Sequence, residues 1–158
     1  MTETISVKIA RQDGFRFLVD FGNGSPNLVA DEPPPIGAGS GPSPERLLAA
    51  AIANCLCGSL LFSLHKYRAD PGHMTASATC EVGRNENNRL RVQHVAVDIA
   101  LGAAPETLPH LDLALAHFQE FCTVTESVRA GIPYAVSIHP TDGSLMIAEL
   151  PQSSEPAL

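Results

Sequence analysis

The feature that most constrains the fold is an uncharged apolar run over residues 47–64, LLAAAIANCLCGSLLFSL. Its length is near the lower limit of a membrane span. Its apolarity is modest, however, because it is rich in Ala and contains Asn54, Gly58 and two serines. We therefore expect a helix that is apolar on all sides and lies in the core of a soluble protein or at a subunit interface, with no membrane partner.

This helix has a clear start. Residues 31–44, DEPPPIGAGSGPSP, are too rich in Pro and Gly for a helix or a central strand, so an irregular loop is expected there. Ser43 can cap the helix, Pro44 suits its first position, and Glu45 lies at the positive end of the helix dipole. The helix is predicted to run to about residue 67.

Strand patterns occupy much of the remaining chain, with one more helical segment. The Asp13-Gly14 pair predicts a hairpin turn. Strands are expected at residues 4–10, 15–21, 27–30, 75–82, 90–101 and 132–138, and a second long helix at 105–130 with a break near Pro109. The order is βββ-α-ββ-α-β, an α+β fold in which sheets cover two long apolar helices.

Length and charge limit the organisation and the partners. At 158 residues, the chain is expected to form a single domain over residues 1–150, followed by a disordered tail at 151–158. A net charge of -7 argues against nucleic acid or an anionic membrane as the partner. The N-terminus shows no secretory signal pattern, so we expect a cytoplasmic protein whose four cysteines are reduced.

Helix geometry predicts that neighbouring cysteines of the first helix lie on different sides of it. Cys55 and Cys57 would lie about 200° apart around a helix, so they cannot form a disulfide or share a metal. No Cys or His has zinc-site spacing, and no metal is expected. Cys55 falls on an apolar stripe of the first helix, and Cys122 on a stripe of the second. If these faces pack together the sulfurs could meet, whereas Cys57 and Cys80 are predicted to be buried filler.

Two segments together resemble a known family. DEPPPIGAGSGPSPERLLAAAIANC, followed downstream by FCTVTESVRAGIPYAVSI, is similar to the osmotically inducible protein C and organic hydroperoxide resistance (OsmC/Ohr) proteins. The shared pattern is a Pro-Glu that opens a long helix, a cysteine ten residues after this Glu (45 to 55), and a second cysteine far downstream at Cys122. The resemblance spans roughly residues 5–140 in element order.

The resemblance implies an intertwined homodimer that acts as a thiol peroxidase on organic or fatty-acid hydroperoxides, without a cofactor. Cys55 would be the peroxidatic thiolate that is oxidised to a sulfenic acid. Cys122 would then condense with it to a disulfide, which an external dithiol, for example of the lipoyl type, would reduce. Glu45 corresponds to the family glutamate that holds an activating arginine.

The position of that arginine departs from the family pattern. Residues 17–44 contain no Lys or Arg, and Arg16 is the best candidate upstream of the helix. An unassisted thiol with a pKa of about 8.5 is largely protonated at neutral pH, so a cation near Cys55 matters for the rate. Two alternatives to the peroxidase therefore stay open. One is a dimeric binding module for an apolar or thiol-bearing small molecule, and the other is a structural dimer with both cysteines as filler.

Overall fold

The computed structural model describes residues 2–149, and the chain divides between Leu48 and Ala49 into two compact units. The predicted α+β class and the order of the elements are confirmed, with one further strand at the C-terminal end. The prediction of one domain over residues 1–150 stays a prediction, as does the homodimer. Residues 151–158 lie outside the described part of the chain.

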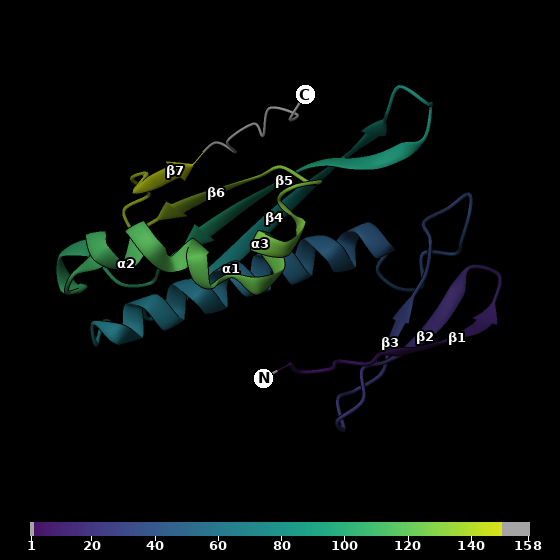
Figure 1. Cartoon of the computed structure of the whole chain (residues 1–158), viewed down its shortest axis with the longest axis horizontal. Coiled ribbons are helices and arrows are strands. Elements are labelled where there is room, and N and C mark those ends of the chain that lie inside the picture. The colour runs from purple at the N-terminus through teal and green to yellow at the C-terminus, as the bar shows by residue number, and fades with distance from the viewer. Residues whose placement is uncertain (1, 150–158) are drawn as a thin grey trace. The chain divides into compact units, whose positions relative to one another are not determined.

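The first unit contains an antiparallel three-stranded sheet (Figure 1). Its strands are β1 (Lys8–Asp13), β2 (Arg16–Asp20) and β3 (Leu28–Ala30), in the order β1-β2-β3. Gly14, in the turn between β1 and β2, has a φ of +47°, a conformation that glycine adopts without steric cost. The predicted hairpin is therefore confirmed.

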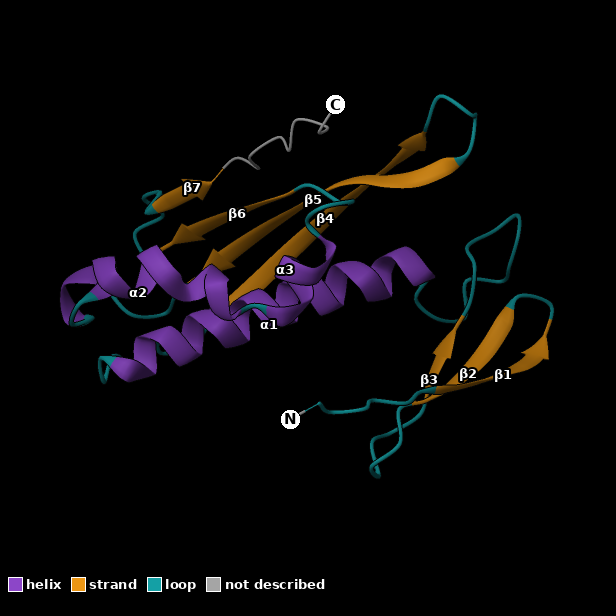
Figure 2. Ribbon diagram, viewed as in Figure 1, coloured by secondary structure: helices purple, strands orange, loops and turns teal. Residues whose placement is uncertain are grey.

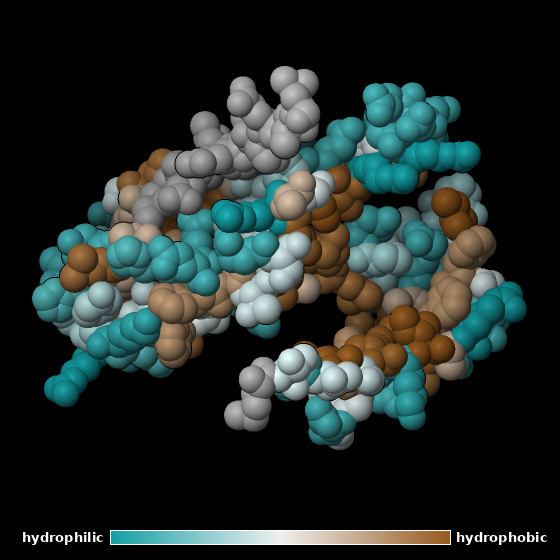
Figure 3. Space-filling model, in the orientation of Figure 1, coloured by the Kyte–Doolittle hydropathy of each residue, from teal (hydrophilic) through white to brown (hydrophobic). Residues whose placement is uncertain are grey.

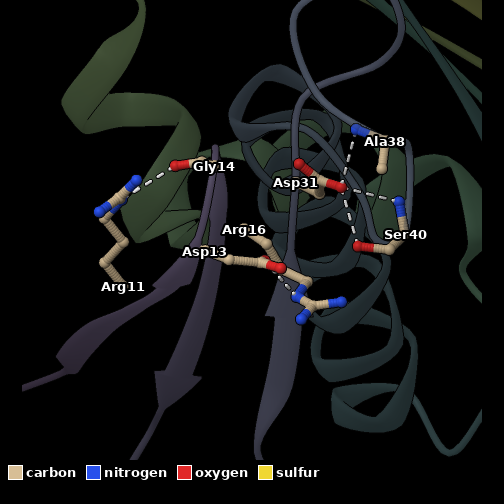
Figure 4. A network of polar contacts seen from close by, with 7 residues as sticks. All are labelled: Arg11, Asp13, Gly14, Arg16, Asp31, Ala38 and Ser40. Carbon is tan, nitrogen blue, oxygen red and sulfur yellow. Dashed lines mark hydrogen bonds and ion pairs between the residues drawn. The ribbon is translucent and has the colours of Figure 1, made fainter.

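The loop after β3 is irregular, as its Pro and Gly content predicts, and it is held by a buried carboxylate. Asp31 Oδ2 accepts hydrogen bonds from the Ala38 N–H, the Ser40 N–H and the Ser40 hydroxyl at 3.2, 3.0 and 2.8 Å (Figure 4). These donors, chiefly those of Ser40, hold the pKa of Asp31 below its usual value. The ionised side chain thereby orders a segment that has no regular secondary structure.

The predicted central helix is confirmed as α1 (Pro44–Lys66). By length and composition α1 could cross a membrane. Its burial is instead that of a core helix, because one residue in every three or four is buried along its length. These residues are Ala49, Ile52, Leu56, Ser59, Leu60, Ser63 and Leu64.

The second unit contains a four-stranded sheet in the order β4-β5-β6-β7 (Figure 2). The strands are β4 (Thr75–Arg84), β5 (Leu90–Ala100), β6 (Tyr134–His139) and β7 (Ile147–Glu149). β5 and β6 are parallel, and the other two pairings are antiparallel. Alternate residues of β5 and β6 are buried on one face: Val95, Val97, Ile99, Val136 and Ile138.

The prediction of one long second helix is wrong. The segment consists of η1 (Pro105–Thr107), α2 (Leu111–His117), η2 (Phe118–Phe121) and α3 (Thr123–Val128). The predicted break near Pro109 is confirmed, since His110 is left-handed with φ 53° and ψ 36°. A second break falls at Cys122, whose φ of -84° and ψ of 91° are extended rather than helical.

The helical pieces pack against α1 and are tied to the sheet. The Ser63 hydroxyl of α1 donates to the Ala114 carbonyl of α2 at 2.9 Å, a buried hydrogen bond. The Tyr134 hydroxyl of β6 donates to Gln119 Oε1 of η2 at 2.6 Å. These contacts fix the segment that precedes Cys122 between the sheet and the core helix.

Candidate functional site

Two cysteines that are distant in sequence meet inside the second unit. Cys55 lies midway along α1 and is half-buried, whereas Cys122 lies between η2 and α3 and is fully buried. The Cys122 thiol shares a hydrogen bond with the Cys55 side chain. Both thiols are free. The packing of the two apolar stripes, which the sequence left open, therefore brings the sulfurs together.

The break at Cys122 creates the local geometry of this pair. The Cys122 N–H donates to the Gln119 carbonyl at 2.9 Å and closes the last turn of η2, and the Glu126 N–H donates to the Cys122 carbonyl at 3.0 Å and opens α3. Cys122 thus occupies a non-helical position between two helical turns. A continuous helix would have given its side chain a different direction, since side-chain direction follows the backbone conformation.

Thr125 is a third member of the site that the sequence analysis missed. Its Oγ1 lies 2.6 Å from Cys122 Sγ, and both residues are 0% exposed. The backbone N–H of Thr125 also hydrogen-bonds the cysteine. The only signal in the sequence was a hydroxyl residue three positions after Cys122, a spacing that matters only if a helix begins there.

The surroundings of Cys122 favour its protonated form. Burial raises the pKa of the Cys122 thiol most, the hydrogen bond with Cys55 raises it further, and the hydrogen bonds from Thr125 oppose this increase. The hydrogen bond joins a fully buried sulfur, that of Cys122, to a half-buried one, that of Cys55. The two thiols therefore differ in their exposure to solvent.

Two exposed aromatic residues lie close to the two cysteines along the chain, and we call them the aromatic border. Phe62 follows Cys55 by two helical turns on α1, and Phe121 directly precedes Cys122. The two rings make an edge-to-face contact with centroids 5.4 Å apart, and Lys66 Nζ lies 3.9 Å from the Phe121 centroid and 4.9 Å from that of Phe62. Phe62 is 53% exposed and Phe121 is 41% exposed. Apolar residues, in brown, occur among polar ones on the face of the molecule that Figure 3 shows. The sequence analysis did not identify this cluster, although the spacing of Cys55, Phe62 and Lys66 on one helix face could have indicated part of it.

Cys57 and Cys80 have other surroundings. Cys57 is half-buried and contributes to a shallow hollow whose wall includes Leu61, Pro71 and Met74. Burial raises the pKa of the Cys57 thiol. Cys80 lies within β4, where it pairs with Val95 of β5. The surroundings of Cys57 differ from those of Cys55, in agreement with the prediction that helix geometry separates the two residues.

The other two predicted site residues belong to the first unit. Arg16 Nε forms an ion pair with Asp13 Oδ1 at 3.1 Å on the hairpin of β1 and β2 (Figure 4). Glu45 lies in the first turn of α1 and is half-buried. The roles of Arg16 and Glu45 in activating Cys55 stay predictions. Among residues 2–149, no three or more His, Cys, Asp or Glu side chains cluster as metal ligands would.

A sequence model of the family described as OsmC-like protein matches residues 37–137, a span that includes both Cys55 and Cys122. The chain belongs to the OsmC-like protein family. No curated protein matches the sequence significantly. The solved structures described next are only 17–19% identical to this chain, so their similarity shows a shared fold.

Three solved structures illustrate the OsmC-like fold of this chain. An OsmC-like protein of unknown function from Vibrio cholerae has a TM-score of 0.71 and 18% identity, covering 85% of this chain and 99% of that one. An organic hydroperoxide resistance protein from Elizabethkingia anophelis has a TM-score of 0.66 and 19% identity, covering 87% and 96%. An organic hydroperoxide resistance protein of Bacillus subtilis has a TM-score of 0.65 and 17% identity, covering 86% and 98%.

Proposed function

We propose that this OsmC-like protein is a thiol-dependent peroxidase that reduces organic or fatty-acid hydroperoxides with Cys55 and Cys122. The observation that carries the proposal is the hydrogen bond between the side chains of the half-buried Cys55 and the buried Cys122, two cysteines that are distant in sequence. Two structural neighbours are named organic hydroperoxide resistance proteins, which supports the same chemistry. We further propose a cytoplasmic homodimer as its working form.

The reaction would have three steps. The Cys55 thiolate attacks the terminal oxygen of the hydroperoxide, so that the O–O bond breaks, Cys55 becomes a sulfenic acid and the alkoxide takes up a proton to leave as an alcohol. The Cys122 thiol then condenses with the sulfenic acid, forming the disulfide and releasing water. An external dithiol reduces the disulfide by thiol–disulfide exchange and is itself oxidised to a disulfide.

The order of the thiols follows from their surroundings. Because Cys122 is buried and is held as a thiol, Cys55 is the sulfur available to react first. Cys122 already contacts Cys55, so the second step needs only a local adjustment to reach disulfide geometry. A preformed pair also shortens the lifetime of the sulfenic acid and protects it from further oxidation.

The aromatic border favours an organic substrate over hydrogen peroxide. Phe62 lies two helical turns after Cys55, Phe121 directly precedes Cys122, and the two rings form one exposed apolar contact. An alkyl or aryl group would bury some of this surface on binding, a favourable contribution that hydrogen peroxide cannot make. This cluster is the basis for proposing an organic hydroperoxide as the substrate class.

Titration of free thiols tests the function directly. One equivalent of cumene hydroperoxide, added to the fully reduced protein, is expected to remove two thiols per chain, and dithiothreitol is expected to restore them. A thiol titre that does not change would contradict the peroxidase. If an apolar ligand also co-purified with the unreactive protein, the binding module would be the better account.

The proposed roles of Arg16 and Glu45 can be tested with matched variants. Arg16→Gln is expected to slow the first oxidation of Cys55 about tenfold or more, because the variant removes the cation proposed to assist the attack on the hydroperoxide. Arg11→Gln is the control, since Arg11 lies on the same hairpin and its Nε donates to the Gly14 carbonyl at 3.0 Å (Figure 4). Glu45→Gln is expected to have the same direction of effect as Arg16→Gln. Equal rates in the Arg16 and Arg11 variants would remove Arg16 from the mechanism.

A further inference from the structure

A buried hydroxyl is directed at the second sulfur of the site. Thr125 is 0% exposed, and its Oγ1 lies 2.6 Å from Cys122 Sγ. Across the described residues, this is the one hydrogen bond of the Thr125 side chain. A buried hydroxyl needs a partner, and here the partner is the thiol that would resolve the sulfenic acid.

We propose that Thr125 is a positioning residue for the resolving step, which holds the Cys122 sulfur against Cys55 and donates to that sulfur as it loses its proton. The inference rests on the proposed function, since it assigns a role within the same reaction. In this step the S–O bond of the Cys55 sulfenic acid breaks and the S–S bond forms. The Cys122 proton leaves with the hydroxyl as water, the Cys122 sulfur is oxidised and the Cys55 sulfur is reduced.

Oxidation of Cys55 would change the balance of effects on the pKa of Cys122. In the reduced protein, burial and the Cys55 side chain raise the pKa of Cys122, while the Thr125 hydroxyl and N–H lower it. Cys55, from α1, is the titratable group that contacts Cys122 within the described part of the chain. Once Cys55 is a neutral sulfenic acid, its charge no longer opposes ionisation of Cys122, but the donors of Thr125 remain. The donors of Thr125 are therefore less opposed after the first step than before it.

Three variants isolate the hydroxyl. Thr125→Val keeps the shape but removes the donor, and Thr125→Ser keeps the donor. Thr123→Val is the matched control, because Thr123 begins the same helix and is exposed. Each protein is mixed with one equivalent of cumene hydroperoxide, and mass spectrometry follows the dimedone adduct of Cys55 and the Cys55–Cys122 disulfide over time. Far-ultraviolet circular dichroism checks the fold, and Thr125→Ala replaces the Val variant if that variant does not fold.

The expected result is a resolving step about tenfold slower in Thr125→Val, with Cys55 sulfenic acid accumulating and the rate–pH profile displaced to higher pH. Thr125→Ser and Thr123→Val should resolve at the wild-type rate. If Thr125→Val forms the disulfide at the wild-type rate and with an unchanged pH profile, this inference is overturned, but the proposed peroxidase function is not. Absence of both adduct and disulfide in the wild-type protein would instead overturn the proposed function.

Discussion

The two sides of α1 carry thiols only two positions apart, yet their surroundings differ. On one side Cys55 contacts Cys122, and the pair is bordered by Thr125, Phe62 and Phe121. On the other side Cys57 faces a shallow hollow beside Pro71 and Met74. The difference shows that the surroundings of a cysteine depend on the residues that pack against its side of the helix. The helix itself determines only the side on which each cysteine lies.

The largest expected difference concerns reactivity toward hydroperoxide. Cys55→Ser is expected to abolish hydroperoxide-dependent loss of thiols, because the remaining thiol of the pair, Cys122, is buried and has no partner cysteine. Cys57→Ser should react like the wild-type protein. Stopped-flow measurement of cumene hydroperoxide consumption compares the two. Full activity in the Cys55 variant, or loss of activity in the Cys57 variant, would contradict the assignment of the reactive thiol to Cys55.

A second difference concerns stability. Leu56 is fully buried on α1, whereas Leu61, which lines the hollow near Cys57, is 36% exposed. Leu56→Ala is expected to lower the free energy of unfolding by about 2–5 kcal/mol, and Leu61→Ala by less than about 1 kcal/mol. Urea unfolding monitored by circular dichroism gives both values. Equal losses would show that the hollow is as well packed as the core face.

The aromatic border should affect substrate choice by a smaller factor. Phe121→Ala is expected to raise the KM for cumene hydroperoxide about fivefold, because it removes roughly 1 kcal/mol of apolar contact. The KM for hydrogen peroxide should not change. Leu113→Ala is the control, since Leu113 is 43% exposed on α2. A parallel change for both peroxides would mean that Phe121 supports the fold of the site rather than the organic group.

The smallest expected effect is a change in the pH dependence of Cys57 alkylation. Burial raises the pKa of the Cys57 thiol, so at any given pH less of it is thiolate than in an exposed cysteine. Its alkylation by iodoacetamide should therefore be slower at pH 8 than in the urea-unfolded chain, and the difference should shrink as the pH rises well above the pKa. Peptide mapping resolves Cys57 from the other cysteines. Faster alkylation in the folded protein would contradict the assigned surroundings.

One half of the site could be predicted from local sequence. Pro44, the preceding loop and the uncharged run determine where α1 begins and that it is central. Helix periodicity then separates Cys55 from Cys57. These properties depend on neighbouring residues, and sequence patterns report them well. The apolar stripe predicted for 105–130 consists of Leu111, Leu115, Phe118 and Cys122. The last three are buried and Leu111 is half-buried, although the prediction of a continuous helix was wrong.

The other half depends on tertiary packing. The extended backbone of Cys122 has no proline or glycine to mark it, so its break could not be read from the sequence. The Thr125 contact exists only because α3 begins after that break. Likewise, the contact of Phe62 with Phe121 joins two elements whose packing no local pattern specifies. β7 is a three-residue strand, too short to show an alternating pattern.

The central claim is that Cys55 and Cys122 form one redox pair, with Cys57 and Cys80 outside it. Its most direct test is non-reducing peptide mapping by mass spectrometry after one equivalent of cumene hydroperoxide has reacted with the reduced protein. The account predicts a single new cross-linked species that joins the Cys55 and Cys122 peptides and disappears with dithiothreitol. A disulfide through Cys57 or Cys80, or four unmodified thiols, would contradict it.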